Sequence, residues 1–246
     1  MTTRTAGRIV GALILGAFFL YGGGSFLVVS SSSSVVPLPQ SAESPGRLVA
    51  GSALLLLNSL AVAVVGVLAF RVLRDRHPRT ANAYLATRTV EAVLLALAPL
   101  GMITLALLMT DGGVSATTDS GPAGLARTAV ENSESAYWVA MTALGAGSIF
   151  FCRALLRTGL LPRPLARWGM VGYAVFALGG ILEMAGYGVG LALSVPGGLF
   201  EVAAGVFLLT RGFRSTTPTR AEDERPDHDP GPHSATLHVS RACPTT

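Results

Sequence analysis

The chain has 246 residues, of which 50 % are hydrophobic and 13 % are charged, and its formal net charge is +4. A soluble domain carries about a quarter of its residues as charged side chains, so this composition excludes an ordinary soluble protein. The apolar residues fall in runs of about twenty, the length that crosses a hydrocarbon layer about 30 Å thick. The predicted fold class is therefore an all-α integral membrane bundle.

Six such runs follow one another and predict six transmembrane helices in one domain, residues 1–213. Charges, prolines or serines bound each run, which supports the count. The predicted spans are Ile9–Val29, Leu48–Phe70, Tyr84–Met109, Tyr137–Leu156, Trp168–Leu193 and Val195–Thr210. Residues 214–246 are rich in proline, charge and small polar residues. Such a segment cannot bury a core, so we predict a disordered cytoplasmic tail.

Arginines gather in every second connection between the spans. They are Arg4, Arg8, Arg71, Arg74, Arg76, Arg79, Arg153, Arg157, Arg163, Arg167, Arg211, Arg214 and Arg220. Basic residues accumulate on the cytoplasmic side of membrane proteins, so both termini are predicted to be cytoplasmic in a cell membrane. Topology thus accounts for the basic charge, and we expect the lipid bilayer, not nucleic acid, as the partner. Tyr84 and Tyr137 are expected at the inner and outer membrane interfaces, respectively.

Four ionisable side chains fall inside the predicted spans, and they are the main functional candidates. They are Arg88 and Glu91 in the third span, Glu183 in the fifth and Glu201 in the sixth. A charge at membrane depth costs about 2.5–3.5 kcal/mol on insertion scales unless it finds a partner or water. Together with Asn58, in the middle of the second span, these residues form the candidate intramembrane polar site.

Helical spacing places Glu183 and Glu201 on faces that are rich in glycine. Small residues mark contacts between membrane helices, so both carboxylates are predicted to point into the bundle. The fifth and sixth spans are predicted to join in a short loop near Pro196. The two glutamates would then lie close together in the outer half of the membrane. Two neighbouring carboxylates in a low dielectric do not both ionise, which suits proton coupling.

Arg88 and Glu91 are three residues apart, a spacing that permits an ion pair on one face of a helix. Such a pair is equally compatible with a structural anchor and with a functional site. Asn58 suits either the same site or a hydrogen bond between helices. No histidine falls in any span and no H-E-x-x-H motif occurs, so we predict no metal, no cofactor and no catalytic residue.

Three segments resemble a bacterial membrane-protein family known as domain of unknown function 4386. They are Arg88-Thr89-Val90-Glu91-Ala92, the basic Pro-containing stretch Leu155–Gly169 and the closing stretch Pro196–Phe213. The resemblance covers roughly residues 7–213 and implies an integral membrane protein of unassigned activity. It nominates Arg88, Glu91 and Glu201, whereas Glu183 depends on helical spacing alone.

Three functions are compatible with these residues. The favoured one is a small transporter or proton-coupled carrier of an unknown small molecule or ion. It would use Glu201 and Glu183 as protonatable groups and Arg88 as an anion contact, and it requires a cavity between spans three, five and six. The alternative is a non-catalytic structural or regulatory protein with a dry polar network. A lipid-modifying enzyme, with a groove beside Arg88 and the inner arginines of residues 153–167, is least favoured. No oligomeric state is predicted.

Overall fold

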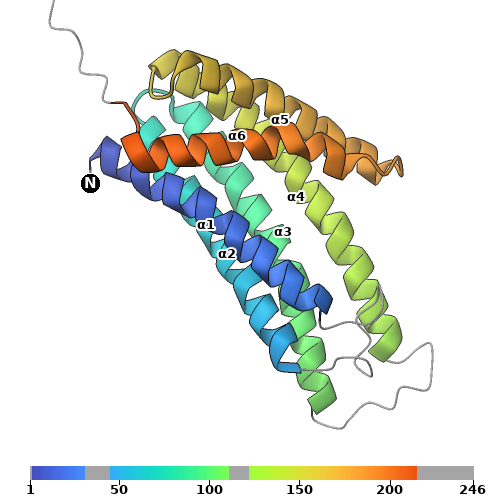
Figure 1. The fold of residues 1–246 in the computed structure, drawn as a ribbon. Helices are drawn as coiled ribbons and strands as arrows, with labels where there is room; N and C mark the ends of the chain where they lie inside the picture. Colours follow the sequence, from blue (N-terminus) through green and yellow to red (C-terminus); the bar gives the residue numbers. More distant parts are fainter. Residues whose placement is uncertain (1, 31–44, 111–121, 215–246) are drawn as a thin grey trace, which may run out of the picture. The chain divides into compact units, whose positions relative to one another are not determined.

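The computed structural model describes residues 2–30, 45–110 and 122–214, and the secondary structure of this part is entirely α-helical (Figure 1). The helices are α1 (Thr3–Ser30), α2 (Pro45–Leu73), α3 (Pro78–Thr110), α4 (Pro122–Thr158), α5 (Arg163–Met184) and α6 (Gly190–Arg211). They belong to one compact unit, Met1–Thr216. The predicted disordered tail lies, from residue 215 on, outside the described residues.

Each of these helices is long and apolar enough to cross a membrane, which confirms the prediction of six spans. Helices α2, α3 and α4 have 29, 33 and 37 residues, more than the roughly 20 that a bilayer requires. Helix α4 begins at Pro122, well before the predicted span, because its first turns are polar and hydropathy detects only the apolar part of a helix.

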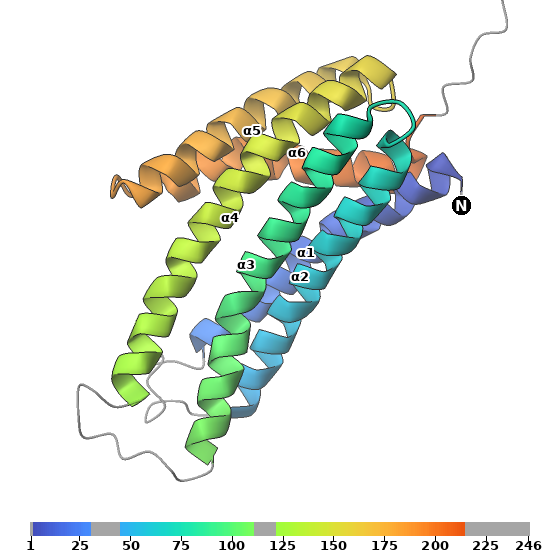
Figure 2. The ribbon, with the colours of Figure 1, turned by 180° about the vertical axis from the view of Figure 1, so that it is seen from behind.

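The helices form a closed ring. Each one packs against the next along the chain, and α1 closes the ring by packing against α6. Figure 1 and the reverse view in Figure 2 show α1 and α6 together near the N-terminus and diverging away from it. A ring closed in this way surrounds a central space.

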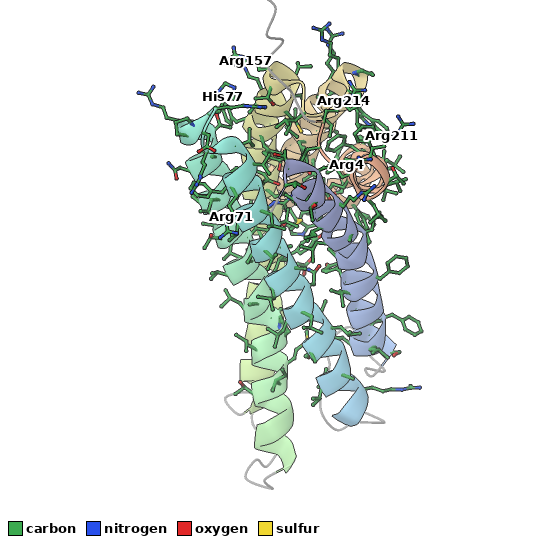
Figure 3. The ribbon with its side chains drawn as sticks, turned by 90° about the vertical axis from the view of Figure 1, so that its left-hand side faces the viewer. Arg4, Arg71, His77, Arg157, Arg211 and Arg214 are labelled. Carbon is green, nitrogen blue, oxygen red and sulfur yellow. The ribbon has the colours of Figure 1, made fainter. Side chains whose placement is uncertain are left out.

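The chain ends of this unit meet. A guanidinium nitrogen of Arg8, Nη2, donates to the carbonyl oxygen of Thr210 at 3.4 Å. Figure 3 shows side chains from the start of α1, the last turns of α2, α4 and α6, the α2–α3 connection and the segment after α6 at one end of the bundle. Those labelled are Arg4, Arg71, His77, Arg157, Arg211 and Arg214. We call this the arginine end. The alternating pattern of arginines in the sequence therefore corresponds to one end of the folded unit.

Glycines allow the helices to approach closely at two contacts. A Cβ on Gly11 of α1 would lie 2.6 Å from the carbonyl oxygen of Gly205 on α6. A Cβ on Gly172 of α5 would lie 3.0 Å from the carbonyl oxygen of Pro196 on α6. Gly172 and Gly205 lie at helix contacts, as predicted, although Gly205 faces Leu15 of α1 instead of α5. Gly198, on the same predicted face of the sixth span, has no atom within 4 Å of an added Cβ and lines the central cavity.

The turn between the last two helices lies earlier than predicted. Helix α5 ends at Met184 and α6 begins at Gly190, so the predicted junction near Pro196 is wrong and Pro196 lies inside α6. Gly186 and Gly188 turn the chain with φ angles of +87° and +66°, a region that suits glycine. The turn sequence is as apolar as the helices, so hydropathy cannot separate it from them.

Candidate functional site

Arg88 and Glu91 form an ion pair inside the bundle. Nη1 of Arg88 lies 3.0 Å from Oε2 and 3.3 Å from Oε1 of Glu91, and the side chains are 7 % and 3 % exposed. Nε of Arg88 donates to the hydroxyl of Tyr84 at 2.8 Å. All three residues lie on α3 with spacings of three and four, which brings their side chains to one face. The guanidinium is thus satisfied largely within its own helix.

Tyr84, which was predicted at the inner membrane interface, faces the inside of the bundle. It is buried, and its ring stacks on Phe151 of α4 with 4.0 Å between centroids. The carbon atom Cζ of Arg88 lies 5.2 Å from the centre of the same ring, a cation–π distance. The contact between Tyr84 and Arg88 could have been predicted from the sequence, because residues four apart lie on one face of a helix.

Small residues on α2 and α4 make room for this polar face. A Cβ on Gly66 of α2 would lie 2.7 Å from Cβ of Arg88, and a Cβ on Gly147 of α4 would overlap Thr87. Larger side chains at these two positions would push α3 out of the ring. The ion pair is therefore placed by glycines on both neighbouring helices.

Glu201 is held by a residue that the sequence analysis missed. The hydroxyl of Tyr173, on α5, donates to Oε1 of Glu201 at 2.7 Å. Tyr173 is buried, while Glu201 is partly exposed. Tyr173 precedes Phe176 by three residues and lies near the glycine-rich face of α5. A tyrosine at that place in the sequence could have predicted a hydrogen-bond partner for a carboxylate inside the bundle.

Glu183 lies elsewhere, and the predicted pair with Glu201 does not form. Its Oε2 accepts a hydrogen bond of 2.6 Å from the backbone N–H of Gly190, the first residue of α6. Tyr173, which contacts Glu201, is ten residues before Glu183 on α5, or about 15 Å along the helix. Glu201 is in the middle of the 22-residue α6. It was predicted near one end of its span, but the α5–α6 turn comes earlier in the chain than the predicted junction near Pro196, so α6 has more residues before Glu201.

A cavity of about 330 Å³ occupies the centre of the ring, and all six helices line it. Asn58, Arg88, Glu91 and Glu201 are on its wall, so four of the five candidate residues meet around one space. Glu183 is not among the lining residues. Ligand sites in proteins commonly have volumes of about 300–1,000 Å³, and this cavity is within that range.

The remaining wall is apolar and aromatic. Phe18 and Tyr21 of α1, Tyr137 of α4 and Phe176 of α5 all face the cavity. The rings of Tyr21 and Tyr137 stack with their centroids 5.9 Å apart. Tyr137 thus lies on the cavity wall, a role that its expected interfacial position did not indicate.

A second cavity of about 320 Å³ lies next to the first one. The two share Tyr21, Asn58, Leu95 and Tyr137, and the second extends to the exposed Glu134 near the start of the α4 span. The C-terminal end of α4 is at the arginine end, and Glu134 is more than twenty residues before it. The second cavity therefore lies toward the opposite end of the bundle.

Toward the arginine end the space is closed. A void of only about 30 Å³ adjoins Arg88 and Glu201 there. Its apolar lining is tightly buried and includes Leu155, Leu161, Phe200, Leu208 and Phe213. Among the described residues, this apolar packing therefore separates the central cavity from the arginine end.

No metal centre is formed by residues 2–30, 45–110 and 122–214, where no three His, Cys, Asp or Glu side chains gather closely enough to bind an ion. The arrangement offers one neutralised ion pair, one carboxylate with a hydroxyl partner and a partly aromatic space. These groups suit binding and proton exchange.

The fold and site define a multi-pass membrane protein with six apolar helices around a cavity that carries buried charge. The family model described as Domain of unknown function (DUF4386) matches residues 9–212. The chain belongs to this family, which confirms the resemblance found over roughly residues 7–213. No curated protein and no solved structure matches the chain.

Proposed function

We propose that the protein is a small membrane carrier whose central cavity binds its substrate and whose Glu201 exchanges a proton. The observation that supports this most directly is the position of Glu201, midway along α6, partly exposed on the wall of a cavity that all six helices enclose. A carrier needs such a site because both sides of the membrane must reach it in turn.

Glu201 suits proton exchange because its partner is neutral. The hydroxyl of Tyr173 is the hydrogen-bond partner of its carboxylate among the described residues. An ionised carboxylate at this depth costs about 2.5–3.5 kcal/mol, and a bound proton or a bound cation removes most of that cost. Arg88 and Glu91 already neutralise each other, which leaves Arg88 poorly suited to the role of anion contact.

The arginine end is assigned to the cytoplasm of a bacterial cell, because basic residues accumulate on that side of the plasma membrane. Both termini of the helical unit then face the cytoplasm. On this assignment, the second cavity lies on the outer side of the central one, and the apolar packing around Leu155 and Phe213 is the inner closure.

The other two functions receive less support. A purely structural network would enclose Glu201 in dry contacts, whereas this carboxylate borders a cavity. A lipid-modifying enzyme requires Arg88 beside the inner arginines. Arg153 and Arg157 instead line a different cavity, of about 300 Å³, with His77 at the arginine end.

The carrier proposal is tested by access to the cavity from both sides of the membrane. Ser194, on the cavity wall, is changed to cysteine in a Cys243→Ser background; Cys152 is retained because it is fully buried. A cationic, membrane-impermeant methanethiosulfonate is applied to right-side-out and to inverted vesicles. We expect labelling of Ser194→Cys from both sides.

Two control positions report orientation in the same experiment. Tyr187→Cys, in the exposed α5–α6 turn, is expected to react only from outside, and Arg214→Cys only from inside. Labelling of Ser194→Cys from one side alone would rule out a carrier, and reversed controls would overturn the assigned orientation.

A further inference from the structure

The charges on the cavity wall favour a cation as the ligand. Its charged lining residues are Arg88, Glu91 and Glu201. Arg88 and Glu91 are paired at 3.0 Å, so their charges cancel, and ionised Glu201 leaves the wall with a formal negative charge. A buried anionic ligand would add to this charge, whereas a cation would offset it.

The aromatic wall favours the same sign. Phe18, Tyr21, Tyr137 and Phe176 line the cavity, and the faces of aromatic rings attract cations, most strongly where water is excluded. Aromatic rings are also large apolar surfaces, so they favour a cation that carries apolar groups over a small hydrated ion.

The cavity reaches the lipid-facing surface between α1 and α6. Three of its lining side chains are also open to the outside of the bundle: Phe18 is 41 %, Val195 is 53 % and Leu191 is 80 % exposed. The two helices touch at the arginine end and diverge beyond it (Figure 1, Figure 2). All three side chains are apolar, so this opening admits a molecule dissolved in the bilayer.

We propose that the cavity binds lipophilic organic cations, which enter from the bilayer between α1 and α6 and pair with ionised Glu201. This rests on the carrier function proposed above and specifies its substrate class. Binding of the cation displaces the proton of Glu201, which leaves through the second cavity toward the outer side. The charge on Glu201 is thus balanced by either a proton or a substrate, which is the basis of exchange.

The test uses tetraphenylphosphonium and its isosteric anion tetraphenylborate on the purified full-length protein in detergent. Binding is measured by equilibrium dialysis, and proton release is measured in weakly buffered solution. We expect saturable binding of the cation, at least roughly tenfold tighter than binding of the anion, since a buried anion would face an unbalanced carboxylate. We also expect proton release when the cation binds at acidic pH.

Three variants locate the interaction. Glu201→Gln keeps an acceptor for Tyr173 but removes the charge, so cation binding should weaken by roughly tenfold or more and proton release should disappear. Phe18→Leu, at the lipid-facing opening, should weaken cation binding by about two- to tenfold without changing tetraphenylborate binding. Glu183→Gln, outside the cavity, should leave both unchanged. Size-exclusion profiles verify that each variant is folded.

Tighter binding of tetraphenylborate, or unchanged cation binding in Glu201→Gln, overturns the proposal. If the cation fails to bind while Ser194→Cys is labelled from both sides, the carrier function stands with a different substrate. If the cation binds through Glu201 while Ser194→Cys is labelled from one side, the ligand class stands and the carrier function fails.

Discussion

The hydroxyl of Tyr173 on α5 donates a hydrogen bond of 2.7 Å to Oε1 of Glu201 on α6, across 28 residues of sequence. This bond joins the two helices at the central cavity, which the Glu201 side chain lines. The side chain with the least compensated charge on the cavity wall is therefore also a link between helices.

Removal of that hydroxyl tests the link. Tyr173→Phe should lower the stability of the folded protein by about 1.5–3 kcal/mol, the range for a hydrogen bond to a charged group. Thermal unfolding in detergent measures the change. Tyr187→Phe, in the exposed turn, is the matched control and should have no effect. An equal stability for Tyr173→Phe would show that solvent in the cavity replaces the bond.

The Arg88–Glu91 pair predicts a non-additive effect. Arg88→Met and Glu91→Leu should each destabilise the protein by about 3–5 kcal/mol, because each leaves an opposite charge buried and unpaired. The double variant should lose much less than the sum of the two. Thermal unfolding of the four proteins forms a double-mutant cycle, and additive losses would show that the two charges are independent.

The contact between α1 and α6 depends on Gly11. Gly11→Ala should destabilise the protein by about 1–3 kcal/mol, because its Cβ would meet the backbone of Gly205 and Leu208, which cannot rotate away. Gly16 on the same helix has open space around it, so Gly16→Ala should be neutral or slightly stabilising. Equal melting temperatures for both variants would contradict this packing.

Glu183 is predicted to be a structural residue. Its carboxylate accepts from the first backbone N–H of α6, so Glu183→Leu should cost about 0.5–2 kcal/mol, the range for loss of a helix cap. Glu183→Gln, which keeps an acceptor oxygen, should lose less. Binding of tetraphenylphosphonium should survive both changes, and its loss would return Glu183 to the functional site.

The candidate site was only partly predictable. Arg88, Glu91, Glu201 and Asn58 were found because polar residues in apolar spans stand out individually, and the three-residue spacing of Arg88 and Glu91 predicts their contact. Their partners Tyr84 and Tyr173 were missed, since a tyrosine near the end of a span is usually interfacial. Whether such a tyrosine is buried depends on the side chains of the neighbouring helix that pack against it, and these are known only from the tertiary structure.

Length and hydropathy by themselves determined that this chain is an all-α protein with six membrane spans and that its arginines gather at one end. Both properties depend on the local cost of placing polar groups in hydrocarbon. Only the tertiary structure decided that Glu201 meets Tyr173 and faces a cavity while Glu183 caps α6. That outcome depends on the turn at Gly186 and Gly188, where backbone geometry, invisible to hydropathy, sets which residues of α5 and α6 lie at the same depth.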